Sequence, residues 1–242
     1  HSDSFLIQAG SGASTFGTPN SPGVTKGTAK DTLLARYNDI ENVKALIEAN
    51  KNEIACIIIE PVAGNMGCIP PKSGFLEAIR SLCDTHNILL VFDEVMTGFY
   101  RTGTFFASEV GKEQPDIMCL SKGLTGGVMA MGVTTCTAKI YDAFLSDHFM
   151  NKTFFHGHSF TANPIACASA NASLDLLLQA ECQDRIKGIQ AKNESFMERL
   201  KGNTKVENIR VMGTILALDV KSDVITGYGN AVRDEINYFF LE

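Results

Sequence analysis

Three short runs of apolar residues lack the alternation of polar and apolar positions that marks a strand with one exposed face. They are IACIIIEPV (54–62), ILLVFDEV (88–95) and DIMCL (116–120), and such runs are typical of strands covered on both faces of a parallel sheet. Between the first two runs, SGFLEAIRSLCDTHN (73–87) has apolar residues at the spacing of one helix face. This order predicts a βαβ unit, so we expect a parallel sheet with its ligand site beyond the carboxyl ends of the strands.

The same patterns extend to the rest of the chain. The first 30 residues are rich in Gly, Ser, Thr and Pro and predict a long loop. Helical spacing recurs at 39–50, 163–179 and 182–202. The segment 206–220 predicts two strands about a turn at Gly213. We therefore expect a large α/β domain over residues 1–185 and the start of a small α+β domain over 186–242.

Composition narrows the function classes. Of the 242 residues, 45% are hydrophobic and 20% charged, and the net charge is −6 with no basic block, which argues against nucleic-acid binding. No apolar run is long enough to cross a membrane, and seven scattered cysteines without a CxxC pair are typical of reduced core cysteines in a cytoplasmic protein. His156 and His158 have no neighbouring Cys or carboxylate, so no metal site is expected. The chain opens at His1 without an initiator methionine or a signal peptide, as a fragment or a trimmed chain would.

Polar side chains with catalytic chemistry follow each of the three predicted strands. Glu60 follows the first strand, Asp93 and Glu94 the second, and Lys122 the third. A lysine in a pocket loses charge stabilisation, so its pKa falls and it becomes an amine nucleophile for a carbonyl. Such a lysine, together with a carboxylate facing a protonated ring nitrogen, is the minimal equipment for pyridoxal phosphate. The alternatives are a solvated lysine at a strand end and, for Asp93 and Glu94, a helix cap or a salt bridge; structural pairing is favoured for Glu94.

Three motifs make this chemistry specific. EPVAGNMG (60–67), FDEVMTGFYRTG (92–103) and CLSKGLTGG (119–127), in this order and spacing, resemble the class III aminotransferases, which are pyridoxal-phosphate enzymes of fold type I. The resemblance covers essentially the whole chain. It implies the large domain of that fold, an α/β unit with helices on both faces of a mostly parallel mixed sheet, followed by the start of the small domain.

The resemblance also implies roles for individual residues. Lys122 would bond to the cofactor aldehyde, Asp93 would face the pyridine nitrogen, and Val95 would pack on the cofactor ring. Ser159, in HGHSFTANP, would reach the cofactor phosphate of the neighbouring subunit. We therefore expect a homodimer with shared active sites that acts on a small-molecule amino donor and a keto or aldehyde acceptor.

The two parts of the chain resemble different branches of the family. Residues 1–99 are similar to glutamate-1-semialdehyde 2,1-aminomutase, in which the QAGSG loop gates the site and Asn65 would contact the phenolic oxygen of the cofactor. Residues 100–242 are similar to adenosylmethionine–8-amino-7-oxononanoate aminotransferase of biotin synthesis, in which Arg101 would bind the substrate carboxylate. The second part is longer and holds the lysine. We therefore expect amino transfer to 8-amino-7-oxononanoate, with the aminomutase as the alternative.

Two other function classes stay open. The phosphate-binding loop of the family and the aromatic residue that stacks on the cofactor ring would precede His1, and a carboxylate-binding residue would follow Glu242. A chain without them would be an inactive scaffold. A dinucleotide-binding oxidoreductase would need GxGxxG after the first strand, and EPVAGNMGC has neither that order nor an acidic residue placed for a ribose.

Overall fold

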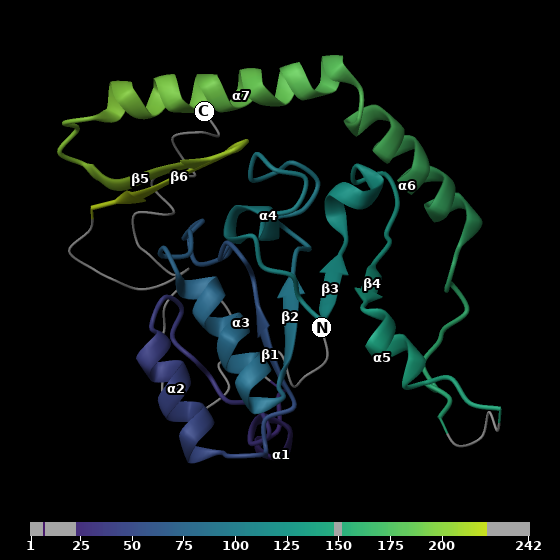
Figure 1. The fold of residues 1–242 in the computed structure, drawn as a ribbon. Helices are drawn as coiled ribbons and strands as arrows, with labels where there is room; N and C mark the ends of the chain where they lie inside the picture. Colours follow the sequence, from purple (N-terminus) through teal and green to yellow (C-terminus); the bar gives the residue numbers. More distant parts are fainter. Residues whose placement is uncertain (1–6, 8–22, 148–151, 222–242) are drawn as a thin grey trace.

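The computed structural model describes residues 7, 23–147 and 152–221, so the predicted QAGSG gating loop lies outside the described residues. In chain order the elements are α1 (Lys26–Ala29), α2 (Ile40–Ala49), β1 (Cys56–Ile59), α3 (Phe75–His86), β2 (Leu89–Asp93), α4 (Ser108–Gly111), β3 (Ile117–Leu120), the 3₁₀ turn η2 (Lys122–Thr125), β4 (Val133–Cys136), α5 (Ala138–Asp142), α6 (Pro164–Leu177), α7 (Ala180–Leu200), β5 (Val206–Met212) and β6 (Ile215–Val220). In Figure 1 the sheet lies between α2 and α3 on one side and α6 on the other, and α7 extends from α6 to the β5–β6 hairpin. No helix among these described elements is long and apolar enough to span a bilayer.

The central sheet is mixed, with the strand order β1-β2-β3-β4. β1 pairs with β2 in parallel, and β2 pairs with β3 in parallel. β4 runs antiparallel to β3. The three apolar runs therefore form three adjacent parallel strands, as the sequence pattern predicts, and their carboxyl ends lie at one edge of the sheet.

The crossover helix α3 covers one face of this sheet. In its apolar stripe, the side chains of Leu76, Ile79 and Cys83 are each at most 2% exposed. These side chains belong to a core cluster with Val43 and Ile47 of α2 and with buried side chains of β2. Both helices present their apolar stripes to the strands, so this cluster holds α2 and α3 against β1 and β2.

The opposite face of β1 differs from the expectation of burial on both sides. Ile57 and Ile59 pack against the core cluster beneath α2 and α3, whereas Ile58 is 43% exposed and Cys56 is exposed. Successive side chains of a strand point to opposite faces, so α2 and α3 cover only one set of them. The continuous apolar run thus predicted the strand correctly. Among the described residues, however, this strand is less buried than the run predicted.

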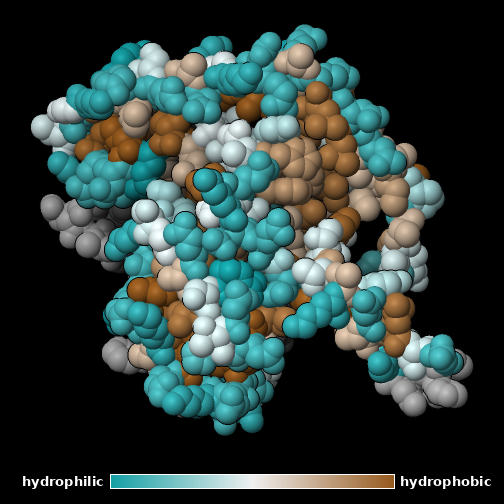
Figure 2. Space-filling view, viewed as in Figure 1, coloured by the Kyte–Doolittle hydropathy of each residue, from teal (hydrophilic) through white to brown (hydrophobic). Residues whose placement is uncertain are grey.

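The helix α6 packs on the turn that follows β3. Ser173 donates its hydroxyl to the carbonyl of Gly123 at 3.2 Å, and Ser169 donates to that of Thr125 at 3.3 Å. Asn163 caps the helix by accepting from the backbone N–H of Ile165 at 2.9 Å. Apolar side chains gather on the visible face where α6 meets the end of the sheet (Figure 2). The turn that holds the candidate lysine is therefore supported by a helix from the second half of the chain.

The β5–β6 hairpin forms a two-stranded antiparallel sheet of its own. Its side chains Met212, Ile215 and Ala217 pack on a small cluster of Val62 and Cys68, together with a buried alanine of the large unit. The boundary expected between residues 185 and 186 falls inside the single helix α7. The division into two domains stays a prediction, and the hairpin is in direct contact with the segment that follows β1.

The tip of the hairpin lies against the loop that follows β2. The backbone N–H and hydroxyl of Thr214 donate to the carbonyl of Arg101 at 3.0 and 3.1 Å. Gly213 has φ +55°, and a Cβ there would overlap the backbone of Gly103 and lie 2.7 Å from the carbonyl oxygen of Arg101. Only glycine fits at this close approach of two backbones.

Candidate active site

The carboxyl ends of β1, β2 and β3 bring Glu60, Asp93 and Lys122 into electrostatic contact. Burial raises the pKa of the Glu60 carboxyl, the Gly64 backbone N–H lowers it, Asp93 raises it, and Lys122 lowers it. In Figure 1 the three parallel strands point the same way, toward the part of the molecule that holds α4. The three strand-end groups therefore lie at the same edge of the sheet, where a ligand site is expected in a parallel sheet.

Asp93 is the last residue of β2 and is half-buried. Its Oδ1 accepts the backbone N–H of Val95 at 3.0 Å, which orients the carboxylate. Among the described residues no donor reaches the second oxygen, Oδ2. An ionised carboxylate can accept on both oxygens, so Oδ2 is able to accept a further charged N–H donor. Val95, also half-buried, is brought beside Asp93 by the same contact.

Lys122 begins the 3₁₀ turn η2 directly after β3. Its φ is +45°, which is uncommon for a residue other than glycine. Ser121 supports this turn by donating its hydroxyl to the carbonyl of Met131 at 2.6 Å. A Cβ on the next residue, Gly123, would lie 2.9 Å from the Cβ of Phe99, so glycine allows the turn to pack on that ring. The backbone at Lys122 is thus kept in an unfavourable conformation by its surroundings, as is frequent at functional positions.

The side chain of Lys122 is exposed in the described structure. The sequence argument placed this amine in a pocket, and the described residues do not enclose it. Lys122 nevertheless has the charged neighbours that the prediction requires, because both Lys122 and Asp93 affect the pKa of the Glu60 carboxyl. The role of Lys122 as an amine nucleophile stays a prediction.

A tight turn after β1 carries Asn65. Glu60 accepts the backbone N–H of Gly64 through Oε2 at 2.6 Å, and the carbonyl of Gly64 accepts the N–H of Cys68 at 2.9 Å. A backbone bridge between Ala63 and Ile69 closes the base of this turn. The Asn65 side chain is exposed at the tip, so it is available to a ligand.

Glu94 has a structural role. Its side chain is fully buried, and its carboxylate accepts the hydroxyl of Thr97 and the backbone N–H groups of Ala107 and Ser108, the latter two at 3.0 and 2.7 Å. The structural pairing favoured for this residue is confirmed. Glu94 ties the loop after β2 to the start of α4 and leaves its neighbour Asp93 to face the site.

We expect Glu94→Gln to destabilise the protein. The amide keeps the shape but turns one acceptor oxygen into a donor that faces the existing donors, and an unsatisfied buried partner of a charged group costs about 2–3 kcal/mol. Urea unfolding should show a lower midpoint with an unchanged slope. The control is Glu53→Gln, because Glu53 is exposed and surface changes usually stay within about 0.5 kcal/mol. Equal midpoints for the two variants would contradict the structural role.

Arg101 and Ser159 are the two remaining residues that the sequence assigns to the site. The backbone of Arg101 is bonded to the hairpin tip, while its side chain is exposed. Ser159 is exposed in the turn before α6. The described structure joins neither side chain to Lys122 or Asp93, so their assignments stay predictions.

Two residues near the site were not singled out by the sequence. Tyr37 donates its hydroxyl to the carbonyl of Pro61 at 2.8 Å, and burial, followed by the Glu60 carboxylate, raises the pKa of this phenol. Arg210 of β5 reaches the turn that carries Asn65. Neither residue lies in a recognisable sequence motif, because each is placed near the site by a contact with a segment that is distant in the sequence.

Comparison with known proteins identifies the family. The sequence profile described as Aminotransferase class-III matches residues 6–236. The chain belongs to the class III aminotransferase family. Class III aminotransferases depend on pyridoxal phosphate, are generally homodimeric and act on small molecules. The predicted family, its class of enzyme and its cofactor are therefore confirmed.

Class III relatives named glutamate-1-semialdehyde 2,1-aminomutase match nearly the whole chain. The relative from Flavobacterium psychrophilum is 46% identical over 99% of this chain and 55% of its own length. The relative from Chlorobium phaeobacteroides is 42% identical over 99% of this chain and 54% of its own length. The chain thus spans about half the length of the curated relatives it matches.

The fold is that of the class III aminotransferases. The crystal structure of an (S)-enantioselective omega-transaminase from Thermomicrobium roseum is 32% identical, with a TM-score of 0.68, over 76% of this chain and 41% of that protein. The expected fold, a mixed and mostly parallel sheet of a fold type I transferase with its helices, is confirmed.

The expected substrate branch was wrong. Four aminomutases are 42–46% identical to the chain over 91–99% of its length, so the likeness to aminomutases continues well past residue 99. The motifs that favoured the biotin-synthesis branch have roles in the fold. Thr102 donates its hydroxyl to the carbonyl of Thr97 at 3.4 Å, and Asn163 caps α6. Such residues indicate how the scaffold is built and carry no information about the substrate.

Proposed function

We propose that this chain is the cofactor-binding part of a glutamate-1-semialdehyde 2,1-aminomutase that uses pyridoxal phosphate. The observation that supports the chemistry is the convergence of Asp93 and Lys122 on one carboxyl group at the carboxyl ends of adjacent parallel strands. The choice of substrate rests on the similarity to aminomutases over 99% of the chain. By its name, such an enzyme moves an amino group from carbon 2 to carbon 1 of glutamate-1-semialdehyde.

The residues present fit the cofactor. Asp93 offers an oriented carboxylate with one oxygen that no described donor reaches, and a pyridinium N–H is a partner of the required charge. Val95 adds an apolar surface beside that carboxylate, and the amine of Lys122 is exposed toward solvent. When bound, pyridoxal phosphate supplies an aldehyde for covalent attachment and a ring that takes up the electron pair released from the substrate.

Each proposed residue has a defined task. The amine of Lys122 would attach the cofactor and, once released, would serve as the base that accepts a proton from the substrate carbon and returns it. Asp93 holds the proton on the ring nitrogen, and Asn65 donates to the phenolic oxygen. None of these tasks needs a redox partner, because moving an amino group within one molecule leaves its oxidation state unchanged.

The proposed assembly is a homodimer. Exposed apolar residues flank Ser159 in the sequence: Phe155 is 81% exposed, Phe160 is 76% exposed and Ile165 is exposed as well. Monomeric proteins rarely leave such side chains together in water. A second copy that covers this surface would bring Ser159 to the cofactor phosphate of its neighbour. This arrangement rests on the general homodimeric state of class III aminotransferases.

A visible absorption spectrum tests the proposed function. The full 242-residue chain with added pyridoxal phosphate should develop a yellow band that borohydride bleaches, and peptide mass mapping should place the phosphopyridoxyl group on Lys122. Addition of glutamate-1-semialdehyde should then yield 5-amino-4-oxopentanoate. A folded chain that gives no band would identify an inactive scaffold, and a band without this product would contradict the substrate.

A further inference from the structure

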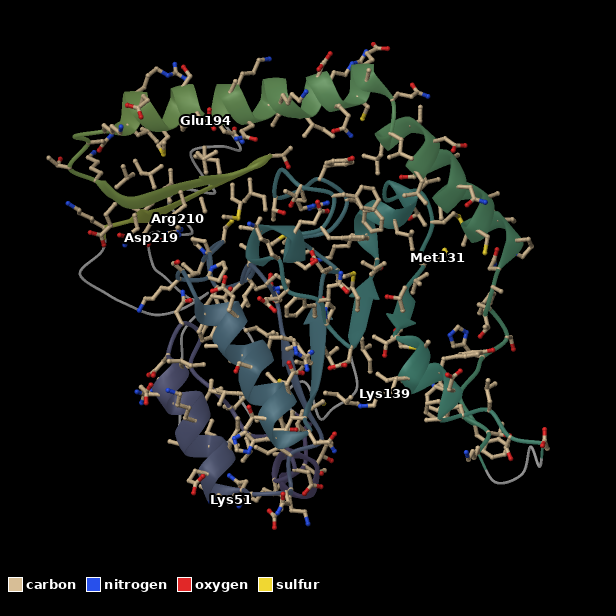
Figure 3. The ribbon with its side chains drawn as sticks, viewed as in Figure 1. Lys51, Met131, Lys139, Glu194, Arg210 and Asp219 are labelled. Carbon is tan, nitrogen blue, oxygen red and sulfur yellow. The ribbon has the colours of Figure 1, made fainter. Side chains whose placement is uncertain are left out.

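The C-terminal hairpin is bonded to the turn that carries Asn65. Arg210 of β5 donates from Nε to the carbonyl oxygen of Gly67 at 2.9 Å, across 143 residues of sequence. Figure 3 shows Arg210 and Asp219 together on the hairpin, at its side nearest the large unit. The contact is a charge-assisted hydrogen bond, which is among the stronger kinds in proteins.

The guanidinium of Arg210 is held in one orientation. Asp219 of β6 accepts from Nη1 at 3.1 Å and from Nη2 at 2.9 Å, and the carbonyl of Asn208 accepts from Nη1 as well. The Arg210 side chain is 17% exposed, while that of Asp219 is 45% exposed. A forked pair of this kind leaves Nε pointing in a fixed direction, toward the turn.

The turn is held from its other side by the large unit. Glu60 accepts the backbone N–H of Gly64, and Glu60 itself follows β1. On the hairpin side, Gly67 has φ +105°, and a Cβ there would lie 3.1 Å from Nη2 of Arg210. The absence of a side chain at Gly67 thus allows the guanidinium to approach the backbone. Asn65 stands between these two fixed points.

We propose that Arg210 is a positioning residue for the cofactor site, which acts by holding the Gly64–Cys68 turn and so the amide of Asn65. The inference rests on the proposed function, because it takes Asn65 as the residue that meets the cofactor's phenolic oxygen. Its consequence is that cofactor binding depends on the C-terminal hairpin, although the hairpin supplies no group that touches the cofactor.

The first measurement requires no cofactor. In Arg210→Met the amide protons of Gly67 and Cys68, whose N–H groups bond to Gly64, should exchange with solvent about tenfold faster or more, as expected when one hydrogen bond from a charged donor is lost. The matched control is Arg185→Met. Among the described residues Arg185 pairs with Glu181 alone, and both side chains are exposed on α7, so its loss should leave the turn unchanged. Unchanged exchange in Arg210→Met would overturn the proposal.

The second measurement is the pH titration of the bound cofactor's visible band. Asn65→Ala removes the hydrogen bond to the phenolic oxygen and should shift the midpoint, and Arg210→Met should shift it in the same direction. Cofactor affinity should fall about tenfold in Arg210→Met, the scale usual for outer partners of a bound group. The double variant should shift the midpoint no further than Asn65→Ala alone.

The outcomes separate the positioning role from the proposed function. A shift in Asn65→Ala without one in Arg210→Met overturns the positioning role and leaves the function intact. No shift in Asn65→Ala overturns the assignment of Asn65 and, with it, the effect proposed for Arg210. Arg210→Lys keeps one charged donor without the fork, so it should restore part of the midpoint. A loss of global stability alone would lower the melting temperature without moving the midpoint.

Discussion

Replacing Lys122 by alanine is expected to abolish covalent attachment of pyridoxal phosphate and to lower turnover by roughly 10⁴-fold or more. The reason is that the same amine is proposed to bond to the cofactor and to move the substrate proton, and Lys122 is the one described lysine that lowers the pKa of the Glu60 carboxyl. Borohydride treatment followed by peptide mass mapping measures the attachment. Conversion of glutamate-1-semialdehyde measures the turnover.

The control for this change is Lys139→Ala. Lys139 is an exposed lysine of α5, and Figure 3 shows it in the lower right part of the view, away from the hairpin. It should retain the yellow band and the wild-type rate. Turnover that survives in Lys122→Ala would show that another group carries the chemistry, and the assignment of Lys122 would then be wrong.

The second large effect is expected for Asp93→Asn. The amide keeps the size of the side chain and removes the negative charge that holds a proton on the ring nitrogen. Turnover should fall by about 10²–10³-fold, as is typical when one electrostatic partner of the transition state is lost. Attachment to Lys122 should persist, because the lysine lies in the turn that follows a different strand, β3. A normal borohydride product with a depressed rate is therefore the expected result.

Two further variants test whether the charge of Asp93 is responsible for the loss of rate. Asp93→Glu restores the charge at a different distance and should recover part of the rate. Asp142→Asn changes an exposed carboxylate of α5 and should change nothing. An unaltered rate in Asp93→Asn would remove the ring-nitrogen role, and loss of attachment in that variant would indicate that Asp93 is needed to build the site.

Together these variants distinguish chemistry from scaffold. Glu94 and Asp93 are adjacent carboxylates with opposite surroundings, because Glu94 is enclosed by three protein donors and Asp93 meets one. A change at Glu94 should therefore alter stability, and a change at Asp93 should alter the rate. This contrast follows from the pleat of β2 and the loop after it, which point the two side chains in different directions.

The substrate shows a limit of motif reading. The aspartate and lysine motifs describe a cofactor site that all members of the family share, so they predicted the family and its cofactor. Arg101 and HGHSFTANP were taken as signs of a branch. In the structure the backbone of Arg101 anchors the hairpin tip, and Asn163 caps α6. Residues 1–99 already resembled the aminomutase, and similarity over the whole chain decided in favour of that branch.

Local sequence determined the sheet and the strand-end groups. The apolar runs at β1, β2 and β3, with the amphipathic α3 between the first two, were sufficient because strand and helix periodicity is written in neighbouring residues. Asp93 and Lys122 followed from those runs, since a residue after a parallel strand must lie at the carboxyl edge of the sheet.

Tertiary structure alone decided which groups surround these residues. The bond from Arg210 to Gly67 joins segments 143 residues apart, and the burial of Glu94 depends on a helix start that follows it in the chain. The exposure of Ile58 likewise depends on which elements pack on each face of β1. Such contacts form between elements that lie far apart in the sequence. The spacing of apolar and polar residues within one element therefore does not predict them.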